Sequence, residues 1–84
     1  MFKIILTPSS LRFLKKCDKE LNDRIYVKLN ELSSDPFPAD SKRIVGREDR
    51  IFRVRVGDYR ILYAVYYEKN EIVVADIDKR SRVY

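Results

Sequence analysis

The spacing of hydrophobic residues changes early in the chain from a strand pattern to a helical one. Residues 2–6 form a short, mostly apolar run that predicts a β-strand. Thr7 followed by Pro8 is typical of a helix N-cap with proline at the first helical position. Apolar side chains then recur every three or four residues, with basic residues mostly between them, at Leu11, Leu14, Cys17 and Leu21. This pattern predicts an amphipathic helix with a basic outer side.

A second helix is predicted directly after a polar break at residues 18–20. Its apolar side chains are spaced by four, four and three residues, at Leu21, Ile25, Leu29 and Leu32. The run Ser-Ser-Asp-Pro at residues 33–36 ends it, and so short a connection between two helices predicts an antiparallel hairpin. Residues 35–49 carry turn-forming residues and predict a loop with a brief extended piece at residues 43–45.

The second half of the chain has the pattern of consecutive strands. Residues 51–56 alternate, Gly57-Asp58 fits a two-residue hairpin turn, and residues 59–67 form the returning strand. A turn at residues 68–71 precedes a last strand at residues 72–78. The order β-α-α-β-β-β predicts an α+β fold, with the N-terminal strand and the helical hairpin packed on one face of an antiparallel sheet. The length predicts a single domain over residues 1–84.

Pairing across the Gly57-Asp58 turn assigns the hairpin residues to two faces. One face is apolar and is expected to meet the helices; it carries Phe52, Val54, Val56, Tyr59, Ile61 and Tyr63. The other face carries Arg53, with Arg55 directly opposite Arg60. Two like charges in opposition are destabilising unless an anion relieves them, which favours a phosphate-binding surface. The alternative is that these arginines only solvate an exposed sheet face or protect an edge from aggregation.

Charge and composition limit which partners and which kinds of catalytic or metal site the sequence allows. The formal net charge is +5, which favours nucleic acid or an acidic protein as partner. The basic run Lys79-Arg80-Ser81-Arg82 is either a solvated terminal run or, because it follows a strand of the same small sheet, a further set of phosphate contacts. Tyr84 suits stacking on an unpaired base. The chain has no histidine and one cysteine, which excludes an ordinary zinc site, a Ser-His-Asp triad and a Cys-His pair. We expect no cofactor and no metal.

Two further expectations concern the cell compartment. Cys17 cannot form an intrachain disulfide, so it is interpreted as a small buried side chain in a protein of a reducing compartment. The N-terminal apolar tract at residues 4–6 is too short for a signal peptide or a membrane span. Both observations predict a cytoplasmic protein.

The run Phe-Arg-Val-Arg-Val-Gly-Asp-Tyr-Arg-Ile-Leu-Tyr at residues 52–63, the following apolar strand, the basic pair Lys79-Arg80 and the nearby Val83-Tyr84 resemble the RelE/ParE toxin superfamily. The predicted order of elements agrees over essentially the whole chain. Within the superfamily the sequence is most similar to RelE-type toxins. The resemblance implies an endoribonuclease that enters the ribosomal A site, cuts mRNA and is silenced by a cognate RelB-like antitoxin.

The resemblance also implies roles for individual residues. Arg53 and Arg55 match positions that grip the RNA backbone, and Arg60 matches an arginine that stabilises the transition state. Arg80 matches a second catalytic arginine, with Lys79 beside it. Tyr84 matches a terminal tyrosine that stacks or assists at the cleavage site.

The resemblance does not identify the residue that accepts the proton. Some relatives use a histidine, or a glutamate with a histidine, and this chain has no histidine. Arginine is a poor base because it stays protonated, whereas a lysine crowded by cations is more easily deprotonated. The candidates are therefore Lys79 and Tyr84, of which Lys79 is preferred.

Two other functions fit the same residues. The first is a ParE-like toxin that inhibits DNA gyrase and cuts no RNA. The second is a non-catalytic RNA-binding module of the same fold, in which the basic face only contacts phosphate. For a RelE-type or a ParE-like toxin, the expected partner is an antitoxin that buries apolar surface and covers the cationic face with acidic residues.

Overall fold

The structure is a computed structural model, and it describes residues 1–44 and 51–79. Two α-helices, α1 and α2, follow a first strand and precede the rest of a five-stranded sheet. The elements in chain order are β1 (Lys3–Leu6), α1 (Pro8–Lys16), α2 (Lys19–Ser34), β2 (Lys42–Arg43), β3 (Ile51–Val56), β4 (Tyr59–Tyr66), the 3-10 turn η1 (Tyr67–Lys69) and β5 (Glu71–Lys79).

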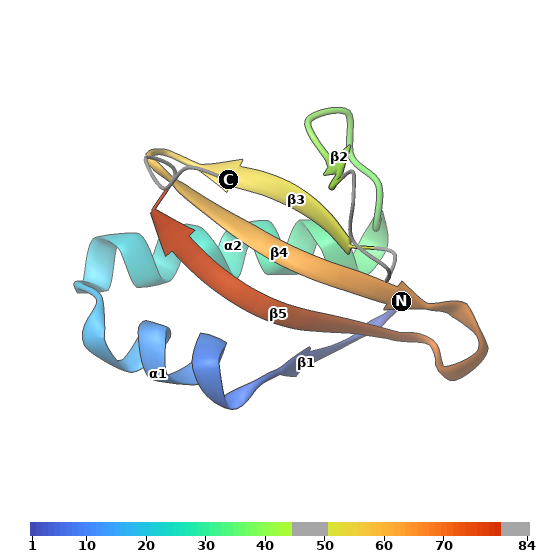
Figure 1. Ribbon diagram of the computed structural model, residues 1–84, viewed down its shortest axis with the longest axis horizontal. Coiled ribbons are helices and arrows are strands. Elements are labelled where there is room, and N and C mark those ends of the chain that lie inside the picture. Colours follow the sequence, from blue (N-terminus) through green and yellow to red (C-terminus); the bar gives the residue numbers. More distant parts are fainter. Residues whose placement is uncertain (45–50, 80–84) are drawn as a thin grey trace.

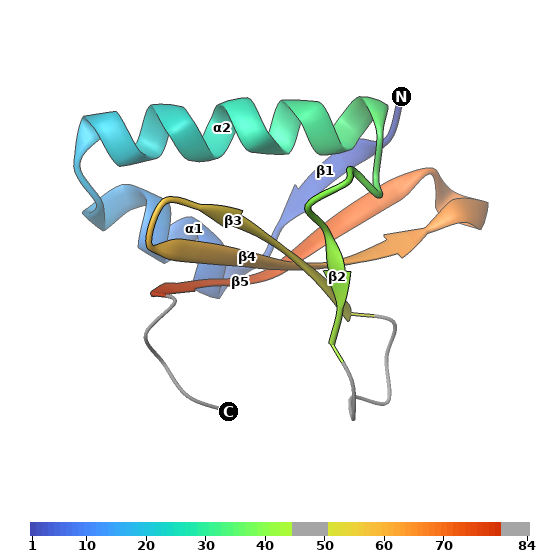
Figure 2. The same ribbon diagram turned by 90° about the horizontal axis from the view of Figure 1, so that it is seen from above.

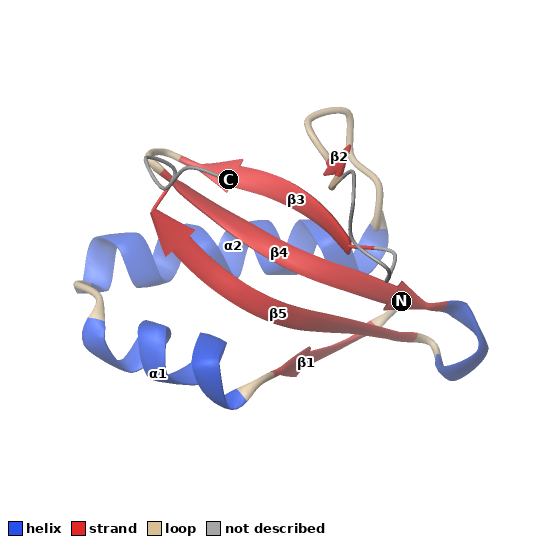
Figure 3. Cartoon of the chain, in the orientation of Figure 1, coloured by secondary structure: helices blue, strands red, loops and turns tan. Residues whose placement is uncertain are grey.

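The described residues form two layers. Both helices lie on the same face of the sheet, which leaves the other face free of helices (Figures 1 and 2). The strand order is β1-β5-β4-β3-β2, so β4 lies in the middle of the sheet (Figure 3). Within residues 1–44 and 51–79, neither helix is long and apolar enough to cross a membrane. The α+β fold predicted from the hydrophobic pattern is confirmed.

Side chains at the helix starts explain where the helices begin. Thr7 caps α1, since its Oγ1 accepts a hydrogen bond from the backbone N–H of Ser10. The same hydroxyl donates to the carbonyl of Val74 at 2.8 Å, which ties the start of α1 to β5. Asp18 caps α2 by accepting a hydrogen bond from the N–H of Leu21 at 2.8 Å. The polar break after the first helix is therefore the cap of the second.

The core lies between the two helices and the sheet. Ile61 and Val54 are fully buried there, and Tyr59 packs edge-on against Phe13 of α1 with ring centroids 5.5 Å apart. The predicted apolar face of the hairpin is thus the face that meets the helices. The buried cluster consists of Leu14, Ile25, Leu29, Leu32, Val54, Val56, Ile61, Tyr63, Val65, Ile72, Val74 and Ile77.

Some details differ from the sequence-based expectation. The pairs β3–β4 and β4–β5 are antiparallel as predicted, and β2 pairs antiparallel with β3, but β1 joins the sheet parallel to β5. An alternating pattern tells which side chains share a face, and it carries no information about strand direction. The strand β2 begins one residue before the extended piece expected at residues 43–45 and ends at Arg43, while residue 45 lies outside the described residues. Cys17 is half-buried rather than buried, because it sits at the C-cap of α1.

Candidate functional site

The candidate site is the helix-free face of the sheet around the β3–β4 hairpin. Across the hairpin, Val56 is opposite Tyr59 and Arg55 is opposite Arg60, as predicted from the two-residue turn. Gly57 adopts a positive φ of 60°, and a Cβ there would lie 3.0 Å from an Nη of Arg24. The positive φ favours glycine here, whereas the Arg24 guanidinium is the end of an exposed, flexible side chain and can move aside.

The three predicted arginines share this face but differ in exposure. Arg55 on β3 is exposed, Arg53 is half-buried, and Arg60 on the central strand β4 is only 5% exposed. An arginine keeps its charge even when buried, so a buried guanidinium needs compensating charge or hydrogen bonds. Arg60 is thus a cation built into the sheet, unlike the solvated arginine that the alternative interpretation described.

The fifth strand brings a carboxylate to Arg60. In the register of β4 and β5, Asp78 lies directly opposite Arg60, on the side away from Arg55. Opposed residues share a face, so a row of two cations and one anion, Arg55–Arg60–Asp78, crosses the sheet. From the sequence, only an external anion was expected to relieve the repulsion between Arg55 and Arg60. The structure adds Asp78 as an internal one.

Asp78 was missed because its position depends on an irregularity in the sheet. The pairing of β4 with β5 shifts by one residue between Leu62 and Tyr63. Such a bulge moves every later residue of β5 to the opposite face relative to a regular ladder. The acidic residues near the end of the last strand were a visible signal, but the face they occupy could not be read from alternation.

Lys79 is described, and its register position differs from that of the arginines. It lies opposite Tyr59, and Tyr59 belongs to the face that meets the helices. The Lys79 side chain is exposed at the end of β5, while its backbone N–H donates to Oδ1 of Asp78 at 2.7 Å. The other tail residues predicted for the site, Arg80, Arg82 and Tyr84, lie outside the described residues.

The short strand β2 adds one cation, Lys42, that was not assigned to the site from the sequence. Lys42 pairs with Arg53 in register and is exposed, so it extends the same face. Arg43 pairs with Phe52. The signal in the sequence was the brief extended piece before residue 46, whose neighbour in the sheet could not be predicted.

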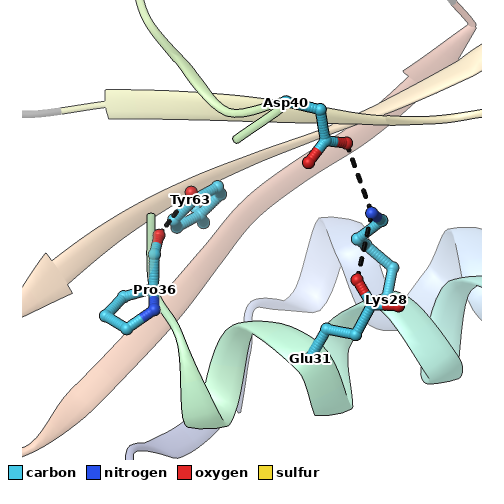
Figure 4. Close-up of polar contacts among 5 residues, drawn as sticks. All are labelled: Lys28, Glu31, Pro36, Asp40 and Tyr63. Atoms are coloured by element: carbon cyan, nitrogen blue, oxygen red, sulfur yellow. Dashed lines mark hydrogen bonds and ion pairs between the residues drawn. The ribbon is translucent and has the colours of Figure 1, made fainter. Parts of the chain in front are cut away.

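Two contacts hold the segment before β2 against the rest of the protein (Figure 4). Lys28 of α2 bridges Glu31 at 3.2 Å and Asp40 at 3.3 Å. Burial acts to lower the pKa of Lys28, but the hydrogen bonds and charges of the two carboxylates outweigh it, so its pKa is raised. The Tyr63 hydroxyl donates to the carbonyl of Pro36 at 2.6 Å. Burial raises the pKa of Tyr63 to about 12, so this donor stays protonated.

A second surface feature lies on the helix side. An apolar groove runs between α2 and the edge strand β1, and Val27 and Tyr26 line it with 61% and 46% of their surface exposed. Single exposed apolar residues are ordinary, but a lined groove of them is typical of an interaction surface. Within residues 1–44 and 51–79, no cluster of three or more cysteine, aspartate or glutamate residues could hold a metal ion.

Comparison with protein families gives one family match over almost the whole chain. A family model described as "ParE toxin of type II toxin-antitoxin system, parDE" matches residues 4–84. The chain is also 32% identical over 79 residues to a Methanocaldococcus jannaschii protein named "Putative toxin RelE1". That alignment covers 94% of this chain and 78% of the relative.

Solved structures with the same fold include toxins bound to their antitoxins. The match in a RelE-RelB complex from Pyrococcus horikoshii has a TM-score of 0.84 at 23% identity and covers 98% of both chains. Isolated E. coli RelE matches with a TM-score of 0.82 at 21% identity, over 99% of this chain and 88% of that chain. The intact E. coli RelBE toxin-antitoxin complex also gives 0.82 at 21% identity. At these identities the similarity shows a shared fold.

Proposed function

Because the chain belongs to the RelE/ParE superfamily of type II toxin-antitoxin toxins, we propose that it is a RelE-type toxin that cleaves mRNA on the ribosome. The observation that carries this proposal is the set of cations on the helix-free face. Arg60 is fixed in the middle of the sheet, and exposed or half-exposed cations flank it at Lys42, Arg53 and Arg55. A cationic face of this kind suits the phosphates of a single RNA strand.

The proposed reaction is attack of a ribose 2'-hydroxyl on its adjacent phosphate. A bond forms between the 2'-oxygen and phosphorus, and the bond from phosphorus to the 5'-oxygen breaks. The products are a 2',3'-cyclic phosphate and a 5'-hydroxyl. One proton leaves the 2'-hydroxyl and another reaches the departing 5'-oxygen, while negative charge increases on the phosphoryl oxygens.

The arginines are suited to stabilise the negative charge that increases on the phosphoryl oxygens. A guanidinium offers several N–H donors in a fixed plane that matches phosphate oxygens. We assign Arg60 and Arg80 to stabilising the phosphoryl charge, and Arg53, Arg55 and Arg82 to holding the RNA backbone. The proton acceptor stays a choice between Lys79 and Tyr84. Positioning by the ribosome is expected to carry much of the catalysis.

Primer extension on mRNA translated in vitro tests the proposal. The wild-type protein is expected to truncate the message inside the reading frame. Arg60→Ala is expected to slow the truncation by roughly 10²–10³-fold, whereas Arg12→Ala, which removes an exposed arginine from α1, is expected to leave it intact. Arg55→Ala provides a second variant at an exposed position, since loss of the buried Arg60 can disturb folding. An uncut message with folded wild-type protein contradicts the proposal.

The proton acceptor is tested by the same assay under single-turnover conditions. Lys79→Ala and Tyr84→Phe are each expected to slow cleavage. The register weakens the case for Lys79, because Lys79 lies in the row of Tyr59 rather than in the row of Arg60, and Tyr84 lies outside the described residues. Wild-type rates in both variants would exclude both residues as proton-transfer groups.

A ParE-like activity is the second candidate, because the description of the matching family names a ParE toxin. Such a toxin would act on DNA gyrase and leave mRNA intact. Gyrase-dependent DNA breakage in the presence of the purified protein, without truncation of translated mRNA, is the result that favours it. Binding to programmed ribosomes without cleavage favours instead a non-catalytic RNA-binding module.

We also propose a RelB-like antitoxin as the protein partner. The matched structures from P. horikoshii and E. coli include RelE-RelB complexes, and this chain offers two surfaces for such a partner. The groove lined by Tyr26 and Val27 suits apolar side chains, and the cationic face suits acidic ones. Co-purification with the product of an adjacent small gene checks the proposal. Val27→Asp is expected to weaken that complex, with Lys19→Asp on the exposed start of α2 as control.

A further inference from the structure

The row Arg55–Arg60–Asp78 raises the question of what orients the Arg60 guanidinium. Arg60 is 5% exposed on the central strand, so its side chain has little solvent around it. On the β3 side its direct neighbour is another cation, Arg55. On the β5 side its direct neighbour is a carboxylate, Asp78. Arg55 therefore repels the Arg60 charge and Asp78 attracts it, and both effects act towards β5.

This asymmetry defines a direction for the guanidinium. Like charges directly opposite repel and unlike charges attract, and both effects are stronger for a buried group than in water. An arginine in this setting is drawn towards β5 and away from β3. A carboxylate that accepts from one edge of a guanidinium leaves the other N–H donors for a phosphate.

Asp78 is itself held in place, which a positioning group requires. Its Oδ1 accepts the backbone N–H of Lys79 at 2.7 Å, at the end of β5. Its nearest acidic neighbour on the strand, Asp76, has a different environment. Asp76 lies opposite Leu62 in register and accepts hydrogen bonds from the Ser9 hydroxyl and from the N–H of Ile77. Asp76 therefore serves the packing of α1 on β5 and is a matched control.

We propose that Asp78 is a positioning residue for Arg60, holding the guanidinium in one orientation so that its remaining donors meet the phosphate undergoing cleavage. The proposal rests on the proposed ribonuclease function for its catalytic consequence. Its structural part, the coupling of Asp78 to Arg60, stands on the register and burial alone. Asp78 touches no reacting atom in this scheme, so its effect on the rate passes through Arg60.

Single-turnover cleavage on programmed ribosomes tests the catalytic part. Asp78→Asn is expected to lower the cleavage rate by roughly tenfold to a hundredfold, the size of effect that follows from a misplaced catalytic group. Asp78→Glu is expected to recover part of the loss because it restores the carboxylate. Asp76→Asn is expected to cleave at the wild-type rate. Equal losses in Asp78→Asn and Asp76→Asn contradict the proposal.

A double-mutant comparison separates positioning from general stability. In the Arg60→Ala background, Asp78→Asn is expected to cause no further loss of rate, because the group that it orients is absent. A merely structural role of Asp78 predicts the same proportional loss in both backgrounds. Additive losses therefore overturn the proposal, even where every variant remains folded.

The structural part has a measurement that needs no activity. The Arg60 side-chain Nε–H resonance, observed by NMR in the full-length protein, reports the environment of the guanidinium. Asp78→Asn is expected to shift this resonance and to speed its exchange with water, while Asp76→Asn is expected to leave it unchanged. If the wild-type protein cuts no mRNA, the ribonuclease proposal fails, yet this spectrum still decides the coupling. An unmoved resonance in Asp78→Asn overturns the coupling.

Discussion

The two faces of the sheet use the same strands for opposite purposes. Ile61 and Arg60 are neighbours on β4, and both are almost completely buried. Ile61 faces the helices, where apolar contact stabilises the fold. Arg60 faces away from them, where its charge must be balanced by Asp78 and, in the proposed function, by RNA phosphate. Burial alone therefore does not distinguish a core position from a functional one.

The largest expected effect comes from the helix-facing side. Ile61→Ala removes a fully buried side chain from the core and leaves a cavity. We expect a loss of about 2–5 kcal/mol in the free energy of unfolding. Urea denaturation followed by circular dichroism measures it. Arg12→Ala on the outer side of α1 is the control and is expected to stay near the wild-type value; a similarly small change in Ile61→Ala would contradict the assignment of this face to the core.

Substitutions on the opposite face are expected to change the cleavage activity. Arg60→Lys keeps the positive charge but loses the planar array of donors. We expect a fall of roughly 10²–10³-fold in single-turnover cleavage, comparable to removal of one transition-state hydrogen-bond donor elsewhere. Denaturation of the same variant shows whether folding is preserved. Full activity in Arg60→Lys would mean that charge alone is needed at this position.

Tyr63 belongs to the helix-facing side, but its hydroxyl reaches the segment before β2. Tyr63→Phe removes the hydrogen bond to the Pro36 carbonyl, at a cost of about 1 kcal/mol in unfolding free energy. The wild-type pKa is raised from 10.0 to about 12, so the neutral form is favoured by folding. The resulting stability is present below pH 10 and is lost as the pH rises towards 12.

The matched comparison for this prediction is the pH dependence of unfolding in the two proteins. Other tyrosines and lysines titrate in the same range, so the difference between wild type and Tyr63→Phe is the relevant quantity. That difference is expected to shrink above pH 10. A difference that stays constant from pH 8 to 12 would show that the hydroxyl titrates alike in the folded and unfolded chains.

The smallest expected effect concerns Arg55, where a substitution is expected to raise the stability and to lower the affinity for RNA. Arg55→Ala removes the like charge opposite Arg60, so the free energy of unfolding is expected to rise by up to about 1 kcal/mol. Binding to single-stranded RNA is expected to weaken, with a salt dependence reduced by about 0.7 per lost phosphate contact. Fluorescence anisotropy at several salt concentrations measures it. A variant that loses stability without losing RNA affinity would assign Arg55 a structural role.

The sequence predicted this division of faces well, for local reasons. A turn of two residues, with glycine at the position that takes a positive φ, determines the pairing of β3 with β4, so Arg55 opposite Arg60 followed from spacing alone. The helices followed from their apolar periodicity and their caps. These features depend on residues close together in the chain.

The features that were missed depend on distant residues. Asp78 reaches Arg60 only because of the bulge between β4 and β5, and Lys42 reaches Arg53 only because a two-residue strand adds to the edge. The burial of Arg60 requires neighbours on both sides of β4. Hydrophobic alternation contains none of this information.

The parallel pairing of β1 with β5 has a consequence for the time at which the site forms. Lys3 lies beside Glu71, so the first strand cannot join the sheet until the last strand has been synthesised. Closing a loop of this length is slow compared with forming a hairpin or a helix. The same strand carries Asp78, so an Arg60 flanked on both sides exists only after β5 has left the ribosome. The order of synthesis thus delays the assembled cationic face until β5 is available.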